Sequence, residues 1–184
     1  MPSLLPAPRA HTPARREVDL SPALPSLEHP DICLGRDLPD RLAVYRDAGL
    51  RIVFTNGCFD VLHPGHVDLL TRARRLGQVL VLGLNTDASV RRLGKGADRP
   101  VNPLAVRAFM AAHLRAVDCV TAFDEDTPEA LIRIVRPDVL VKGGDWPVER
   151  MAGADFVRAY GGEVVSLPLL DGYSTSAFLA AVRG

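Results

Sequence analysis

The chain has 184 residues, of which 22 are basic and 22 are acidic, so its formal net charge is zero. This length fits one domain of ordinary size with a tail, and the balanced charge excludes a basic footprint for nucleic acid or for an anionic membrane. Three cysteines without a CxxC pair fit a reducing compartment and exclude a disulfide framework.

The N-terminal region is set apart by its prolines. Eight of the fifteen prolines fall before residue 40, a density that excludes a helix or a central strand and favours an extended segment. They also interrupt the chain before a signal-type apolar core can form, and no apolar run approaches the ~18–20 residues that span a bilayer. We therefore expect a soluble, cytoplasmic protein with a Pro-rich, flexible extension over residues 1–36, either a plain tail or a partner-binding arm, and one domain over residues 37–184.

The domain is expected to open with a short amphipathic helix over residues 38–48. The segment that follows, RIVFTNGCFDVLHPGHVDLLTRARRL, spans residues 51–76 and is the centre of the chain. Its β-branched and aromatic start predicts a buried strand over residues 51–55. After a turn, an apolar stripe that begins at Pro64 predicts a helix, which Gly77 ends.

Two histidines, His63 and His66, lie in the first turn of this predicted helix, and their i, i+3 spacing places both imidazoles on one face. A helix N-terminus binds phosphate through its free N–H groups and positive dipole end, and Gly65 lets a ligand approach the backbone. Two imidazoles there can donate hydrogen bonds to phosphate oxygens as negative charge builds up. The alternatives are structural caps, or zinc ligands together with Cys58 or Asp60. Zinc needs three or four such ligands, and no second pair of Cys or His residues follows downstream.

The segment TNGCFDVLHPGH resembles the HxGH nucleotidylyltransferases. It is most similar to the heptose-1-phosphate adenylyltransferases, which form the partner domain of a sugar kinase in bifunctional heptose enzymes. HxGH alone recurs by chance, whereas HxGH after a predicted strand and an N-G-x-F-D turn is specific. The resemblance covers residues 51–184. It implies direct nucleotidyl transfer, which needs positioning and charge stabilisation more than a covalent nucleophile.

The next predicted strand, over residues 78–84, is continuously apolar, as in a parallel sheet that is buried on both faces. Asn85 follows at its carboxyl end, where open α/β sheets bind ligands, although an Asx turn before a short helix over residues 86–92 explains it equally. A basic loop with two glycines, residues 91–100, is either a solvated surface loop or a mobile cover for a triphosphate. The resemblance places a lysine in this loop, which corresponds here to Lys95.

A helix is predicted from residue 102 to about residue 114, because Asn102 and Pro103 suit its cap and first position. Its Arg107 matches an arginine that related transferases use near the phosphates, although on its own it is typical of a surface or an ion pair. Further along the chain, the patterns predict a strand over 116–122, a helix over 127–135 and a strand over 139–141.

The strand over residues 139–141 ends in the segment VKGGDW, which supplies a lysine, backbone flexibility and a carboxylate at a ligand-binding strand end. This segment is either a plain glycine turn or, by its resemblance to the VKGGD segment of the family, part of the site. In the second case Lys142 contacts a phosphate group, and Gly143 and Asp145 lie against the nucleotide.

A helix over residues 149–160 and a strand over residues 163–167 are predicted next, and the segment GYSTS then precedes a final helix that runs to Val182. Ser174 suits an N-cap, but hydroxyl residues at a positive helix end also form an anion site. The resemblance implies that this segment binds the nucleoside triphosphate.

Strands that alternate with helices predict an α/β fold, with a Rossmann-like parallel sheet of about five strands and flanking helices. The resemblance implies the same nucleotidylyltransferase fold. The chain lacks the GxGxxG fingerprint, so NAD binding is not supported, and it lacks a GxxxxGK[ST] loop, which disfavours a P-loop kinase.

The resemblance implies that an oxygen of a sugar 1-phosphate attacks the α-phosphorus of ATP and that pyrophosphate leaves. With D-glycero-β-D-manno-heptose 1-phosphate as acceptor, the product is ADP-heptose. Mg²⁺ is expected to arrive with the triphosphate and not on protein ligands. The expected acceptor-binding residues are Asn56 and Asp60, which otherwise shape the turn. The expected catalytic residues are His63, His66, Lys95 and Lys142, and the expected nucleotide-binding residues are Thr55, Phe59, Gly65, Asn85, Arg107, Gly143, Asp145, Tyr173, Ser174 and Thr175.

Two other functions compete with this interpretation. Cytidylyltransferases that act on glycerol 3-phosphate or a similar alcohol phosphate share HxGH and the final hydroxyl segment, but they usually carry an Arg-Thr pair where Leu169 and Leu170 stand here. An idle nucleotide-binding module would have lost a histidine or the terminal hydroxyls, and neither is lost. Because a Pro-rich arm stands where the family often has a kinase, a separate sugar kinase is the expected source of acceptor, and family likeness indicates a homodimer.

Overall fold

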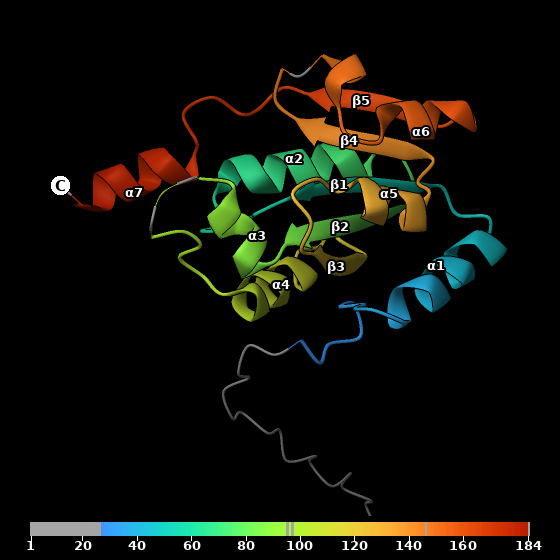
Figure 1. Ribbon diagram of the computed structural model, residues 1–184, viewed down its shortest axis with the longest axis horizontal. Coiled ribbons are helices and arrows are strands. Elements are labelled where there is room, and N and C mark those ends of the chain that lie inside the picture. The colour runs from blue at the N-terminus through green and yellow to red at the C-terminus, as the bar shows by residue number, and fades with distance from the viewer. Residues whose placement is uncertain (1–26, 95, 97, 146, 184) are drawn as a thin grey trace, which may run out of the picture.

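The computed structural model describes residues 27–94, 96, 98–145 and 147–183. Its centre is a five-stranded sheet in the order β3-β2-β1-β4-β5, and every neighbouring pair is parallel (Figure 1). The predicted Rossmann-like parallel sheet is therefore confirmed. The strands are β1 Ile52–Gly57, β2 Val79–Asn85, β3 Cys119–Phe123, β4 Val139–Gly143 and β5 Glu163–Leu167.

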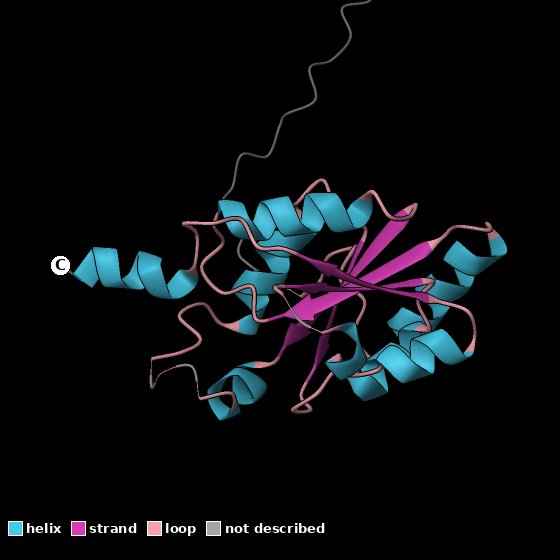
Figure 2. Cartoon of the chain, turned by 90° about the horizontal axis from the view of Figure 1, so that it is seen from above, coloured by secondary structure: helices cyan, strands magenta, loops and turns pink. Residues whose placement is uncertain are grey.

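Helices cover both faces of this sheet, as Figure 2 shows, and each face has its own apolar core. On one face, α2 (Pro64–Arg74) and α4 (Leu104–Ala112) pack against alternate strand residues such as Val53 and Val141. On the other face lie α1 (Asp37–Asp47), α5 (Glu129–Val135) and α6 (Ala154–Ala159). Because successive strand side chains point to opposite faces, burial on both sides explains the continuously apolar strands.

The remaining elements lie at the carboxyl end of the sheet. The short helix α3 (Asp87–Arg92) follows β2, and the 3₁₀ turn η1 (Val148–Arg150) follows β4. Helix α7 (Thr175–Arg183) extends away from the sheet at the C-terminal end (Figures 1 and 2). Chain order reverses between β1 and β4, so this end has the crevice in which open α/β sheets bind ligands.

Two features differ in detail from the sequence expectation. The helix expected over residues 149–160 is divided into η1 and α6, because Gly153 between them has a left-handed φ of 81°. Residues 31–33, on the N-terminal side of the expected domain boundary, pair with β3: the Cys33 amide donates to Val120 O at 2.8 Å. Residues 1–26 of the expected extension lie outside the described residues, and no helix within the described ranges is long and apolar enough to cross a membrane.

Candidate active site

The two histidines of the HxGH motif lie together where α2 begins. His63 is the N-cap residue in an extended conformation, and its side chain makes no capping hydrogen bond. The imidazoles of His63 and His66 stack with ring centroids 3.8 Å apart and planes 22° apart. Phe59 also packs against His66, with ring centroids 5.0 Å apart. The structure thus holds the two imidazoles as a pair at a positive helix end.

Gly65 allows this close arrangement. A Cβ atom added at Gly65 would lie 3.1 Å from both Cε1 and Nδ1 of His63 and 3.3 Å from Cβ of Tyr173. The Nδ1 atom of His63 is buried and has no hydrogen-bond partner among the described residues. Burial also lowers the pKa of His63 below its ordinary value. His63 is therefore a neutral imidazole near neutral pH, with a polar atom that a ligand can satisfy.

Two adjoining cavities open in front of this pair, with volumes of about 470 Å³ and 330 Å³. The larger lies over the start of α2 and the segment before α7, and the smaller over the turn after β1 and the end of β4. Together they have the size of a site for a nucleotide and its phosphates. The residues that line both are His66, Leu69, Arg99, Leu169 and Thr175.

Asp60 organises one wall of the site. Its side chain is fully buried and accepts hydrogen bonds from Arg99 Nε at 2.7 Å, the Val101 amide at 2.8 Å and the Asn102 amide at 2.9 Å. Burial alone would raise the pKa of the Asp60 carboxyl, but these bonds together hold its pKa below the ordinary value. Since its oxygens are already occupied, Asp60 fixes the end of the basic loop, which agrees with the turn-shaping alternative for this residue.

The start of α7 is joined to the same residue. The hydroxyl of Thr175 donates to the backbone oxygen of Asp60 at 2.9 Å. Ser174 accepts a hydrogen bond from the Ala177 amide at 3.1 Å, as an N-cap does. Tyr173, Ser174 and Thr175 all line the larger cavity, so the segment serves as a cap and as a wall of the site.

The segment after β4 closes the smaller cavity. Lys142 and Gly143 line it together with Asn56. A Cβ atom added at Gly143 would lie 2.8 Å from Cδ2 of Leu69, so a larger residue there would require the Leu69 side chain to move. Asp145 is exposed and lines neither cavity.

Three residues expected in the nucleotide site lie beneath it. Thr55 is fully buried in β1, and Asn85 is buried and donates to Ser89 Oγ at 3.0 Å. Arg107 is 1% exposed, pairs with Asp87 at 2.7 Å and donates to Cys58 O at 2.8 Å. None of the three lines either cavity. In this geometry Arg107 is an ion-pair residue that also stabilises the turn after β1 through its hydrogen bond to Cys58 O.

The basic loop contributes Arg99, a residue that the sequence reasoning did not assign to the site. It is 7% exposed and lines both cavities, while its Nε is held by Asp60. The only sequence signal for it is its place in the basic segment that ends at Pro100. Lys95, the basic residue assigned instead, lies outside the described residues.

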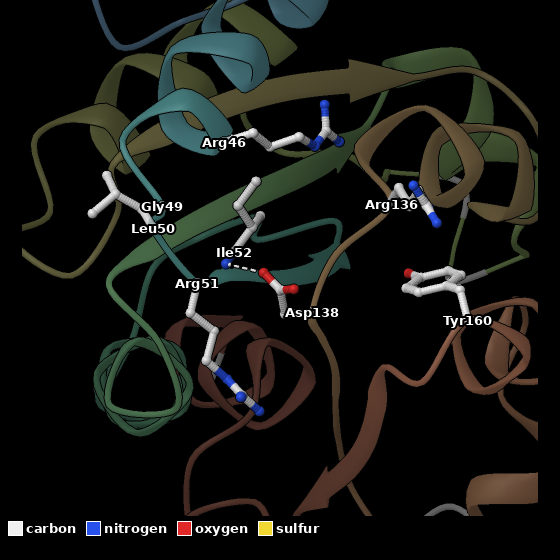
Figure 3. Close-up of a pocket in the computed structure, with 8 residues that line it drawn as sticks. All are labelled: Arg46, Gly49, Leu50, Arg51, Ile52, Arg136, Asp138 and Tyr160. Carbon is white, nitrogen blue, oxygen red and sulfur yellow. Dashed lines mark hydrogen bonds between the residues drawn. The ribbon is translucent and has the colours of Figure 1, made fainter.

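A further cavity, of about 540 Å³, lies at the amino ends of β1 and β4, away from the histidine pair, and is lined by three arginines (Figure 3). Arg46 donates to Val135 O at 2.7 Å, and Arg136 stacks over the ring of Tyr160 at 4.8 Å. Helices α1, α5 and α6 all end near this cavity. Arg46 and Arg136 lie at negative helix ends, and Arg51 pairs with Glu163 at 2.5 Å, which explains the three arginines without a ligand.

The family of the chain follows from comparison with known proteins. Residues 54–164 match the Cytidylyltransferase-like family model. The chain belongs to this family and is a nucleotidyltransferase.

Among its relatives are proteins named bifunctional protein HldE. The chain is 49% identical to that of Nitrobacter hamburgensis over 170 residues, which is 92% of this chain and 34% of the relative. It is 57% identical to that of Halorhodospira halophila over 150 residues, which is 80% of this chain and 31% of the relative. The chain thus spans about a third of the length of these relatives.

Solved structures agree with the fold. The lipopolysaccharide core biosynthesis protein from Thermoplasma volcanium is similar to the chain with a TM-score of 0.55 and 26% identity, over 68% of this chain and all of that chain. The pantoate-beta-alanine ligase from Francisella tularensis, at 13% identity and a TM-score of 0.51 over 83% of this chain and 77% of that chain, shares the fold alone.

Proposed function

We propose that the chain transfers AMP from ATP to D-glycero-β-D-manno-heptose 1-phosphate, with release of pyrophosphate and formation of ADP-heptose. The observation that carries this proposal is the stacked pair of His63 and His66 at the start of α2, which faces cavities also lined by Arg99. Two imidazoles, a helix N-terminus and a guanidinium together suit a polyphosphate that gains negative charge during transfer.

In the proposed step, an oxygen of the sugar phosphate forms a bond to the α-phosphorus, and the bond from the α-phosphorus to the bridging oxygen breaks. Pyrophosphate leaves with that electron pair. His63 and His66 donate hydrogen bonds to the α-phosphate and to the bridging oxygen. Arg99, which lines both cavities, contacts the β- and γ-phosphates. The role expected for Lys95 stays a prediction, because this residue lies outside the described residues.

Mg²⁺ is proposed to enter with ATP and to neutralise part of the triphosphate charge. The one carboxylate among the described cavity-lining residues, Asp60, already accepts three hydrogen bonds. No group of three or more His, Cys, Asp or Glu side chains in the described part of the chain can hold a metal ion. Oxygens of the triphosphate would supply the ligands of this metal.

The choice of adenylyl over cytidylyl transfer rests on residues at the mouth of the site. Leu169 lines both cavities and Leu170 is 40% exposed, at positions where glycerol-phosphate cytidylyltransferases usually carry an Arg-Thr pair. The identity to the HldE proteins favours the heptose acceptor. We propose further that a sugar kinase supplies this acceptor and that the chain acts as a homodimer.

The test is pyrophosphate release by the purified chain with Mg²⁺, the heptose 1-phosphate and each nucleoside triphosphate in turn. We expect release with ATP and its loss in the variant His66→Ala. Release with CTP alone would reverse the choice of base. If no triphosphate reacts with the heptose phosphate, glycerol 3-phosphate or other acceptors, the idle nucleotide-binding module becomes the favoured alternative.

A further inference from the structure

A small cavity lies beside the candidate active site, on the other face of the sheet. Its volume is about 220 Å³, and Asn56 and Lys142, which line it, also line the smaller cavity of the active site. The two spaces therefore meet at the carboxyl ends of β1 and β4. The other residues that line the small cavity are Pro128, Leu140, Val141, Arg150, Met151 and Ala152.

The alternation of side chains assigns the cavities to opposite faces. Phe54 and Leu140 belong to the core beneath α1, α5 and α6, and Asn56 and Lys142 stand two residues further along the same strands, so they share that face. His63 and His66 instead lie at the start of α2, which packs on the other face. Lys142 consequently stands at the boundary between the histidine pair and the small cavity.

The lining of the small cavity combines an apolar floor with a cationic rim. Leu140 and Met151 are buried, while Asn56 contributes an amide and Lys142 an ammonium group. Arg150, in η1, is exposed, and its side chain makes no hydrogen bond or ion pair within the described ranges. Two cations at the rim of a site with few carboxylates suit a phosphate monoester.

We propose that this small cavity is the acceptor subsite, which holds the sugar of a sugar 1-phosphate and places its phosphate between Lys142 and Arg150. The inference rests on the proposed function. In transfer at phosphorus the attacking and leaving oxygens lie roughly in line. If pyrophosphate leaves along the α2 face, the attacking oxygen comes from the opposite side, where this cavity opens.

The sizes of the cavities agree with a nucleotide at the histidine pair and a sugar in the small cavity. Pockets for drug-sized ligands have volumes of about 300–1,000 Å³, and the two cavities at the histidine pair fall in that range, at about 470 and 330 Å³. The small cavity, at about 220 Å³, is below it. A single sugar ring fits such a volume better than a nucleotide does.

The test is calorimetric binding of the heptose 1-phosphate to the whole chain in the presence of α,β-methylene ATP, which cannot release pyrophosphate. The variant Arg150→Gln should weaken sugar phosphate binding about tenfold or more, since a lost charged hydrogen bond has this magnitude. It should leave the affinity for α,β-methylene ATP unchanged. The matched control is Arg158→Gln, on the exposed side of α6 and away from the cavity, which should change neither affinity.

A second variant tests the cavity without a change of charge. Ala152→Leu should fill part of the volume and weaken sugar phosphate binding, again with unchanged binding of the ATP analogue. The subsite is overturned if neither variant weakens the sugar phosphate, if Arg150→Gln weakens the ATP analogue instead, or if the wild type binds the analogue but no sugar phosphate. Failure of the wild type to bind the analogue at all would overturn the proposed function, and with it the subsite.

Discussion

At the scale of single residues, Asp60 connects parts of the site that are distant in sequence. Its carboxylate binds Arg99 and the amides of Val101 and Asn102, and its backbone oxygen accepts from Thr175. A carboxylate with its partners at 2.7–2.9 Å in a buried position is a structural centre for the basic loop. We infer that it positions Arg99 and does not itself contact the acceptor.

The variant Asp60→Asn tests this assignment. Loss of one partner from a buried ion pair leaves the other charge uncompensated and costs about 3–5 kcal/mol, so we expect the free energy of unfolding in urea to fall by about 3 kcal/mol. The control Asp171→Asn, in an exposed turn, should change it by less than about 0.5 kcal/mol. If the two variants lowered the free energy of unfolding equally, Asp60 would not be the structural centre of the basic loop.

The pKa of His63 provides a second test at this scale. Burial lowers it below the ordinary value of 6.5, so between the folded-state pKa and pH 6.5 the unfolded chain binds a proton that the folded chain does not. The contribution of His63 to folding therefore falls as the pH falls through this window.

This pKa can be measured by an NMR titration of the imidazole C–H signals, with His63→Gln to assign them. We expect a value below 6.5 in the free chain. It should rise when ATP and Mg²⁺ bind, because a nearby anion favours the protonated form. A value that does not move on nucleotide binding would place the phosphates away from this imidazole.

At the scale of elements, the strand-turn-helix unit of β1 and α2 was predictable because its signals are local. The β-branched run, Pro64 at the helix start and the spacing of His63 and His66 lie within one continuous segment. The choice of Arg99 over other basic residues of its loop was not predictable. Asp60, 39 positions earlier, determines which guanidinium faces the cavity, whereas Arg92 in the same stretch pairs with Asp126 on the surface.

The start of α2 depends on Gly65. A methyl group there would displace the His63 ring by a few tenths of an ångström, while alanine favours the helix by up to about 1 kcal/mol over glycine. We expect Gly65→Ala to lower kcat/KM about tenfold or more without a fall in melting temperature. Val67→Ala, at an exposed position of the same helix, should leave kcat/KM unchanged. Full activity of Gly65→Ala would show that catalysis does not depend on the close approach of Gly65 to the His63 ring.

Gly153 explains why one predicted helix became two elements. Its φ of 81° is left-handed, and an added Cβ would lie 2.8 Å from Cδ1 of Ile132 in α5. The sequence pattern around it is helical, but the left-handed backbone at Gly153 ends that continuity where it lies against α5. Gly153→Ala should destabilise the fold by about 1–2 kcal/mol or more, measured by urea unfolding. A stabilised variant would indicate that the segment prefers one continuous helix.

At the scale of the whole molecule, the parallel sheet brings segments from the entire domain to one edge. The turn after β1, the basic loop, the end of β4 and the start of α7 all line the cavities before the histidine pair. The alternating pattern of strands and helices predicted this edge, because parallel strands place their carboxyl ends together. The pairing of residues 31–33 with β3 was not predicted, since it depends on a contact almost 90 residues away in sequence.

The measurement that tests the central claim most directly is the mass of the product formed from ATP and the heptose 1-phosphate. The acceptor should carry ¹⁸O in its phosphate group. Direct attack by the sugar phosphate on the α-phosphorus predicts one nucleoside-diphosphate sugar per pyrophosphate, with all of the label retained in that product. Pyrophosphate accompanied by free AMP and unreacted sugar phosphate would contradict the account, because water and not the sugar phosphate would then be the acceptor.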